Sequence, residues 1–227
     1  MMGATPEMDC PNDEEKPVHE VSLSDFYMAE TEVTQRLWQV VMGTSITRQK
    51  EKAQATTLAG EDSNFPMYYV NYDEALLFCQ RLNKLLEKQI PEGYSFSLPT
   101  EAQWEYAARG GNKNEGAKYA GSNMIDAVAW YVGNSGESSH IVGSKRANAL
   151  GIYDMSGNVW EWCKDWYANS YVSYDTNNPV GPSSGSYRVA RGGGWYNSAS
   201  NCRVARRGGS SPGDHGNDFG FRVVLLP

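Results

Sequence analysis

The carboxylates of Asp154 and Glu161 are the residues of this sequence best suited by type and spacing to bind a metal ion. Asp154 begins the turn-forming run DMSGN, and Glu161 lies three residues after its end, within GIYDMSGNVWEWCKDW (residues 151–166). In such a run Asp, Ser, Gly and Asn fold back on their own backbone or tolerate positive φ. Several oxygens on a compact, bent backbone are what Ca²⁺ prefers. The full EF-hand pattern is absent, and a second interpretation stays open: Asp154 caps the turn while Glu161 pairs with an arginine.

The cysteines and histidines do not form a recognisable metal-binding or catalytic pattern. The four cysteines are scattered without a CxxC pair, so neither a zinc ribbon nor a disulfide-dense scaffold fits, although one or two disulfides stay open: Cys10, Cys79, Cys163 and Cys202. Cys79 is expected to be a small buried helix residue, and Cys202 has no obvious base to activate it. The three histidines lie in separate loops without ligand spacing. A P-loop, a G-x-S-x-G motif and a dinucleotide-binding fingerprint are all absent.

The composition indicates a soluble, globular and loop-rich protein. Of 227 residues, 40% are hydrophobic, 12% are aromatic and 23 are glycines, which favours a fold pinned by aromatic clusters over a helix bundle. The net charge of −7 argues against a general nucleic-acid binder. From Arg188 onward, arginines outnumber the acids Asp214 and Asp218. They form either a basic face for an anionic partner or hydrogen bonds to loop carbonyls, and we favour the second.

A strand and three helices are expected to position these residues. Trp160, Trp162 and Trp166 alternate with polar residues, which predicts a strand with its indoles on one face and a core around it. Thr34 can cap a helix over residues 34–42, with Gly43 as its stop. Capping boxes begin two more helices, one at Asn71 and Glu74 and one at Thr100 and Gln103.

The remaining segments are expected to be strands or loops. Residues 1–20 should form an irregular N-terminal arm, and residues 21–227 a single domain. Alternation predicts a strand over 18–28 and allows one at 127–132, whereas 44–66 is expected to be a loop. No stretch reaches transmembrane length. The compartment stays open, since an exported or surface-anchored protein whose leader has been trimmed would begin as abruptly as this chain does.

Seven motifs spread over nearly the whole chain resemble the formylglycine-generating-enzyme (sulfatase-modifying factor) family. They are FYMAETEVTQ (26–35), LPTEAQWEYAARGG (98–111), YAGSN (119–123), ANALGIYDMSGNVWEWC (147–163), RGGGW (191–195), CRVARR (202–207) and GFRVV (220–224). The resemblance implies a single C-type-lectin-like domain of the α+β class, loop-rich, with short strands and two or three helices. It also implies a Ca²⁺ site at the turn, matched here by Asp154, Gly157, Val159 and Glu161.

The resemblance does not carry over the oxidase chemistry of that family. The family's oxidases bind copper through two cysteines, five residues apart, shortly after the R-G-G-S-aromatic motif. The corresponding stretch here, residues 195–202, holds only Cys202. The chain also lacks the additional domain with a histidine iron site found in ergothioneine-pathway sulfoxide synthases. We therefore expect no copper and assign no catalytic residue.

The last third of the chain resembles the variable proteins of diversity-generating retroelements, which display hypervariable side chains on this fold. Adenine mutagenesis hardly produces Lys, Glu, Gln or Met, and none of these four follows Trp195. Residues with the look of fixed anchors are Cys202, Arg203, Val204, Arg207, Pro212, Phe219, Gly220, Phe221 and Arg222. The candidate display positions are Tyr196, Asn197, Ser198, Ala199, Ser200, Arg206, Gly208, Gly209, Ser210, Gly213, Asp214, His215, Gly216 and Asp218. An ordinary Gly/Ser-rich surface loop is the alternative.

Two hypotheses about function follow. The first is a non-catalytic binding module whose C-terminal loops meet a protein or glycan ligand on another cell or phage surface, without nucleic acid or a membrane span. The second is an enzyme of the formylglycine-generating or sulfoxide-synthase family with chemistry that does not need the paired cysteines. A convex or shallow face over residues 196–218 would favour binding, and a deep pocket with a shifted acid would favour catalysis.

Overall fold

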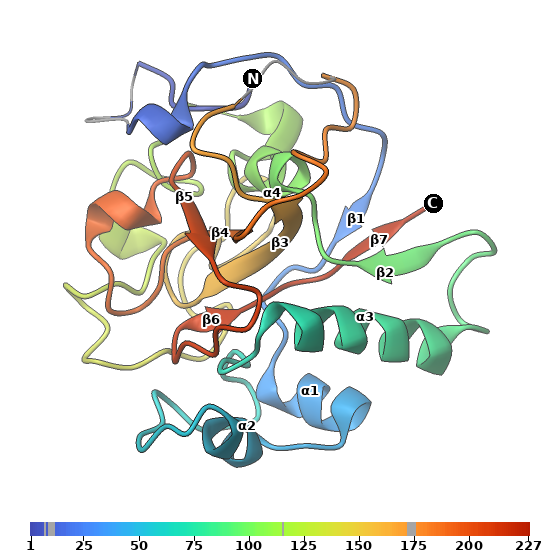
Figure 1. Ribbon diagram of the computed structural model, residues 1–227. Helices are drawn as coiled ribbons and strands as arrows, with labels where there is room; N and C mark the ends of the chain where they lie inside the picture. The colour runs from blue at the N-terminus through green and yellow to red at the C-terminus, as the bar shows by residue number, and fades with distance from the viewer. Residues whose placement is uncertain (7, 9–11, 115, 172–175) are drawn as a thin grey trace.

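The computed structural model describes residues 1–6, 8, 12–114, 116–171 and 176–227 (Figure 1). Cys10 lies outside these residues, and Cys79, Cys163 and Cys202 are free thiols in the interior. Among the described helices, none combines the length and the apolar character needed to cross a bilayer.

Helices gather at two ends of the molecule, and the strands lie between them. The α-helices of the described chain are α1 (Gln35–Met42), α2 (Ile46–Lys52), α3 (Tyr72–Leu86) and α4 (Glu101–Ala108). The strands are β1 (Tyr27–Met28), β2 (Ser95–Ser97), β3 (Trp160–Trp166), β4 (Arg188–Arg191), β5 (Arg207–Ser210), β6 (Phe219–Gly220) and β7 (Val224–Leu226). Figure 1 shows α1, α2 and α3 at one end and α4 at the other.

The predicted helix starts are confirmed. The Thr34 side chain accepts a hydrogen bond from the backbone of Leu37, and α1 ends at Gly43, which is left-handed with φ 74°. Both capping boxes form, at Asn71 before α3 and at Thr100 before α4. Local sequence therefore sets these boundaries, because each side chain satisfies backbone N–H groups that the helix cannot pair itself.

The larger sheet has the order β5-β4-β3-β6, with β3 and β6 parallel and the other pairs antiparallel. Its register places Trp162, Ala190 and Gly208 in one row across the strands. The neighbouring row, on the opposite face, is Glu161, Arg191 and Arg207. Alternate residues of a strand point to opposite faces, so one face of the sheet is aromatic and the other is charged.

The aromatic face confirms the strand predicted from the tryptophan alternation. Trp160 and Trp162 both contact the Phe219 ring, with centroids 6.3 and 5.0 Å away. Trp162 is fully buried and belongs to the main hydrophobic core, which includes Trp38 and Phe221. Because each aromatic residue buries a large apolar area, this cluster supplies much of the driving force for folding.

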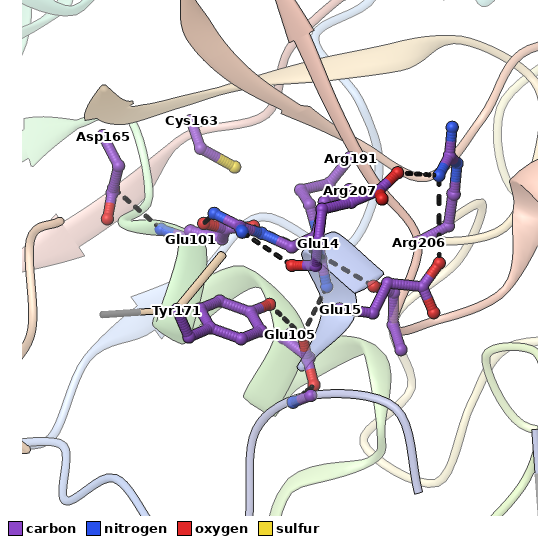
Figure 2. Close-up of polar contacts among 12 residues, drawn as sticks. Glu14, Glu15, Glu101, Glu105, Cys163, Asp165, Tyr171, Arg191, Arg206 and Arg207 are labelled. Carbon is purple, nitrogen blue, oxygen red and sulfur yellow. Dashed lines mark hydrogen bonds and ion pairs between the residues drawn. The ribbon is translucent and has the colours of Figure 1, made fainter. Parts of the chain in front are cut away.

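The charged face packs against α4 and consists of buried ion pairs (Figure 2). Glu101 accepts two bonds from Arg207, at 2.6 and 2.7 Å, and one from Arg191 at 3.1 Å. Arg191 also donates to Glu105 at 2.6 Å, as Arg109 does at 2.9 Å. Burial raises the pKa of Glu105, but the neighbouring arginines outweigh it and lower that pKa to about 2.

The N-terminal arm is packed into this charged region. Glu15 is fully buried, and its two oxygens accept bonds from Arg203 at 2.6 and 2.7 Å. Glu14 binds Arg206 at 2.5 Å. The backbone N–H of Gly3 donates to Glu105 at 2.8 Å. The acidic residues of the arm thus neutralise arginines from the last third of the chain.

A second sheet joins distant parts of the sequence. β7 lies between β1 and β2 and pairs antiparallel with both, so the C-terminal residues close against the segment around Tyr27. This arrangement positions GFRVV, including the buried Phe221 and Arg222, between the two sheets.

Two expectations about secondary structure were wrong, and one strand that the sequence allowed does not form. The segment 44–66 contains α2, which Ser45 caps by accepting a bond from Arg48; its polar surface hides the helical period. The strand expected at 18–28 is reduced to β1, and before it only His19 and Ser22 pair, each through a single isolated bridge. Residues 127–132 form no strand beyond the isolated bridge of Trp130 with Gly157. The helix count was therefore one too low, while the α+β class is confirmed.

The buried ion pairs predict a large cost for removing one partner. Glu101→Gln leaves the Arg207 guanidinium buried with its charge unmatched, which should lower the free energy of unfolding by about 3–5 kcal/mol. The control is Glu51→Gln, which breaks the exposed Arg48–Glu51 pair and should cost less than about 1 kcal/mol. Urea denaturation of both variants measures the difference. Equal stability of the two variants would contradict the account of the charged face.

Candidate ligand-binding surface

Two segments carry most of the candidate display positions. The first display segment (residues 196–202) follows Trp195 and ends in the 3₁₀ helix η4 (Ala199–Cys202). The second display segment (residues 208–218) runs from β5 to the start of β6. Figure 1 shows both in orange and red beside the larger sheet.

Buried anchors hold the backbone of these segments. Cys202 and Val204 are fully buried, and burial raises the pKa of the Cys202 thiol to about 12. Arg203 is buried in its pair with Glu15. Phe221 stacks edge-on against Phe78 in the core, with ring centroids 5.1 Å apart. Since interior side chains are close-packed, these anchors leave the intervening backbone little freedom.

Most candidate display positions lie at or near the surface, as expected. The exposed ones are Tyr196, Ser198, Ser200, Gly209, Gly213 and Asp214. The half-buried ones are Asn197, Ala199, Arg206, Gly208, Ser210, His215 and Gly216. Asp218 departs from the expectation of a surface residue, because it is 1% exposed.

The first display segment is closed by hydrogen bonds to its neighbours. The Asn197 Oδ1 accepts from the backbone N–H of Gly194 at 2.8 Å, and the Asn197 N–H donates back to the Gly194 carbonyl at 3.0 Å. The Asn197 carbonyl accepts from Val132, which ties this segment to a neighbouring loop. The Ser198 and Ser200 hydroxyls bond each other at 2.8 Å on the surface. The segment is therefore fixed in shape and polar outward.

The second display segment is tied to the start of α3. The carbonyls of Gly216 and Pro212 accept from the backbone N–H groups of Tyr69 and Tyr72, each at 3.0 Å. Asp214 accepts from the Ser210 hydroxyl and from the backbone of Ser211, at 2.5 and 3.0 Å. These bonds make it a structured turn with exposed side chains.

Two of the candidate glycines lie against aromatic rings. A Cβ added to Gly208 would meet the Trp160 ring at 3.0 Å, and one added to Gly209 would meet Tyr167 at 2.7 Å. A larger side chain at either position must shift its ring. A larger residue at Gly208 therefore requires the Trp160 ring to move, and one at Gly209 requires the Tyr167 ring to move.

The arginines of the last third do not form a basic surface. Arg191, Arg203, Arg207 and Arg222 are buried. Arg191 bonds the carbonyls of Val204 and Ala205, and Arg222 bonds those of Ala29 and Tyr153. The expectation that these arginines bind loop carbonyls is confirmed, and most of them also pair with buried glutamates.

The turn expected to bind Ca²⁺ brings only part of the implied ligand set together. The two oxygens of Glu161 already accept bonds from Arg222, at 2.7 and 2.8 Å, and one also accepts from Trp104 at 2.7 Å. Asp154, with φ 58°, accepts from the backbone of Gly143 at 2.6 Å, and its Oδ1 has no partner. Among the described residues, no three His, Cys, Asp or Glu side chains are grouped to hold a metal.

Glu32 is a member of this turn region that sequence reasoning missed. It is 2% exposed, and its Oε1 lacks a partner. Burial, followed by the nearby charges of Asp154 and Glu161, raises its pKa well above the usual range. Burial also raises the pKa of Asp154 to about 6. Three carboxyl groups, of Glu32, Asp154 and Glu161, lie near a single arginine, Arg222, and this excess of negative charge favours a bound cation. The hydrogen bonds that Glu161 already accepts do not favour one.

The other two implied ligands contribute backbone only. Gly157, with φ 79°, passes so close to the Trp130 carbonyl that any side chain would clash. Val159 is fully buried. Close packing alone therefore explains why a glycine occupies position 157 and an apolar residue position 159, without a metal ion.

A pocket of about 230 Å³ is lined by residues outside both display segments, although Arg207, next to the second segment, forms part of its wall. Its wall includes His19 from the arm, Glu101 at the start of α4 and Asp165 near the end of β3. Burial raises the pKa of Asp165 to about 7, although its carboxylate accepts a bond from the Glu101 backbone at 2.9 Å (Figure 2). No candidate display position lines this pocket.

The anchors and the exposed positions should respond differently to substitution. The triple variant Tyr196→Ser, Ser198→Tyr, Ser200→Asn removes no buried group, so each change should alter the free energy of unfolding by about 0.5 kcal/mol or less. Phe221→Ala leaves a core cavity and should cost about 3–5 kcal/mol. Urea denaturation compares them. If the triple variant loses as much stability as Phe221→Ala, these exposed side chains stabilise the fold and are not free to vary.

Known proteins resemble the chain along its whole length. Residues 1–226 match the Sulfatase-modifying factor enzyme 1-like domain. The chain is 33% identical to the chaperone protein LppX of Paenibacillus barcinonensis, covering 90% of this chain and 81% of that protein. It is 34% identical to the formylglycine-generating enzyme of Streptomyces coelicolor, covering 71% of this chain and 52% of the enzyme, so it spans about half of that enzyme's length.

A solved structure has a similar fold over the whole chain. Treponema denticola variable protein 1 superposes with a TM-score of 0.83 at 34% identity, covering 100% of this chain and 91% of that one. The fold is thus C-type-lectin-like, and the protein belongs to the Sulfatase-modifying factor enzyme 1-like domain family.

Proposed function

We propose that this protein is a non-catalytic display protein that binds a ligand through residues 196–218. The observation that carries the proposal is the contrast between exposed Tyr, Ser and Asp side chains and the buried anchors beside them in sequence. Such an arrangement allows side chains to change while the backbone stays fixed. The likeness to a variable protein over the whole chain supports it.

The residue types on this surface suit recognition of a protein or a glycan. Tyr196 is 47% exposed and provides contact area at a low entropy cost, while the serines adapt their hydrogen bonds to different partners. A target on another cell or on a phage surface is the partner that we propose. A net charge of −7 and the buried arginines disfavour nucleic acid.

The alternative of an enzyme rests on the pocket beside Asp165. A titratable group with a shifted pKa in a pocket is a recognised sign of catalysis. The neighbouring Glu101 is already neutralised by Arg207, however, so its carboxylate is not free to act as a second acid or base. At the copper position of the family, Asn197 lies five residues before Cys202, whose thiol is buried and protonated at neutral pH. We therefore favour binding over redox turnover.

Sequencing the coding locus in independent isolates tests the display function. We expect a reverse transcriptase gene nearby, and a near-copy of the last coding segment that differs only at adenines. Codons for the exposed candidates should vary among isolates, while those for Cys202, Val204 and Phe221 stay constant. Uniform codons over 196–218, or purified protein that converts a sulfatase peptide's cysteine to an aldehyde, would contradict the proposal.

We also propose that Ca²⁺ binds at the turn, supported by the unpartnered oxygens of Asp154 and Glu32. The ion would be held by these carboxylates and by backbone at Gly157 and Val159. Chelation should then lower the melting temperature, because any ligand of the native state stabilises it. Asp154→Asn should remove that response to the chelator. A melting temperature of the wild-type protein that does not change with chelator would end this proposal.

A further inference from the structure

We propose that the open edge of β1 is a second binding site, which takes an extended peptide segment of a partner protein. The peptide adds a strand beside β1 and alternates basic with apolar residues. This site is separate from the display segments and does not depend on the proposed display function. Four features carry the proposal: a groove, a row of free backbone groups, two unlike faces and an unpaired carboxylate.

A groove of about 670 Å³ lies along the segment that leads into β1. This volume is within the range of about 300–1,000 Å³ that is usual for ligand sites. Its wall includes every residue from 21 to 28. The described residues that complete the wall are Tyr94, Tyr106, Ala107, Asn112, Leu150 and Ile152. None of them belongs to residues 195–218, so the groove is distinct from the display surface and from the copper position of the family.

β1 is an edge strand whose outer backbone groups are free. The sheet order is β1-β7-β2, so β7 covers only one edge of β1 (Figure 1). The Ala29 N–H donates to the carbonyl of Val223, next to β7. Backbone groups of a strand alternate between its two edges, so those of Phe26 and Met28 face away from β7. Within the described chain, no hydrogen bond uses the backbone N–H or carbonyl of either residue. A free edge of this kind accepts a further strand.

The free stretch lies between two paired points on the same edge. Before it, the Ser24 N–H donates to the Asn178 Oδ1 at 2.8 Å. After it, the Glu30 carbonyl accepts from the backbone N–H of Tyr153 at 2.8 Å. The edge between these points is about 20 Å long, at about 3.3 Å per residue of strand. A peptide of about three to five extended residues therefore fits between them.

The two faces of this segment differ in chemistry. The Phe26 ring packs edge-on against Tyr106, with centroids 6.1 Å apart, and the neighbouring Tyr27 ring lies 6.4 Å from Tyr94. Consecutive side chains thus point to opposite faces, as in any strand. Leu150 adds a further apolar side chain to the groove wall. Because side chains of an added strand alternate in the same way, every second residue of the peptide meets an apolar face.

Asp25 gives the other face its charge. By the alternation of a strand it shares a face with Tyr27, which is 66% exposed. Asp25 is exposed, has no hydrogen bond or ion pair within the described chain, and is the only charged side chain among the described residues of the groove wall. A basic side chain of the peptide pairs with this carboxylate and gains a cation–π attraction to Tyr27 or Tyr94. The occupant is therefore basic on one face and apolar on the other.

The test is amide hydrogen exchange of the whole ¹⁵N-labelled protein, with and without the peptide acetyl-Val-Lys-Val-Lys-Val-amide. At a saturating peptide concentration, exchange at Phe26 and Met28 should slow by about tenfold or more, because their N–H groups gain partners. Exchange at Tyr27 and Ala29 should not change, since these residues already face β7. Alternate residues of one strand thus serve as matched controls within the same experiment.

Two control peptides and two variants separate the contributions. A Val-Glu-Val-Glu-Val peptide reverses the charge, and a lysine peptide that is N-methylated at its central residue cannot pair its backbone there. Both should bind about tenfold more weakly or worse. Asp25→Asn should weaken binding of the lysine peptide by about two- to fivefold, the effect of one exposed ion pair. Asp73→Asn, at an exposed aspartate of α3 outside the groove, should leave it unchanged.

Failure of the lysine peptide to protect Phe26 and Met28 would overturn the proposal, and so would equal binding of either control peptide. Protection that rises with protein concentration in the absence of peptide would overturn it by assigning the edge to a second copy of this chain. Shifts of the Tyr27 and Tyr94 ring signals with triacetylchitotriose, without protection by the peptide, would assign the groove to a glycan instead. Variation of the codons for 196–218 among isolates is a separate readout, so the display function can stand when this site fails.

Discussion

Pairing of buried charge on one face of the larger sheet is the constraint on which the structure depends. Arg191 and Arg207 project from adjacent strands into the interior, where Glu101 and Glu105 of α4 neutralise them. A charge in the interior is tolerated only when it is matched and hydrogen-bonded. Each of these strands must therefore keep its register against α4, and the segments that leave the strands start from fixed points.

The same constraint explains how loops with little regular structure can have a defined shape. The first display segment leaves β4 through Trp195 and returns to β5 through Arg203, whose partner Glu15 comes from the N-terminal arm. The chain between these points is short and is closed by backbone bonds, so its conformation does not depend on its outward side chains. A surface of this kind can change its chemistry at little cost in stability.

Sequence alone predicts the parts of the fold that local physics determines. Thr34, Asn71 and Thr100 each mark a helix start, because capping is a local interaction. The pairing of Glu15 with Arg203 could not be predicted, since no local pattern links residues so far apart. The burial of Asp218 escaped prediction for the same reason: an aspartate between Asn217 and Phe219 looks like any polar loop residue.

Hydrogen exchange of a chain whose exposed positions Tyr196, Ser198, Ser200 and Asp214 are all replaced tests the central claim most directly. If the buried anchors alone fix the backbone, the amides of Cys202, Val204 and Phe221 should keep the protection that they have in the original chain. Loss of protection at these amides, with the rest of the core unchanged, would show that the outward side chains hold the backbone. That result would contradict a scaffold built for display.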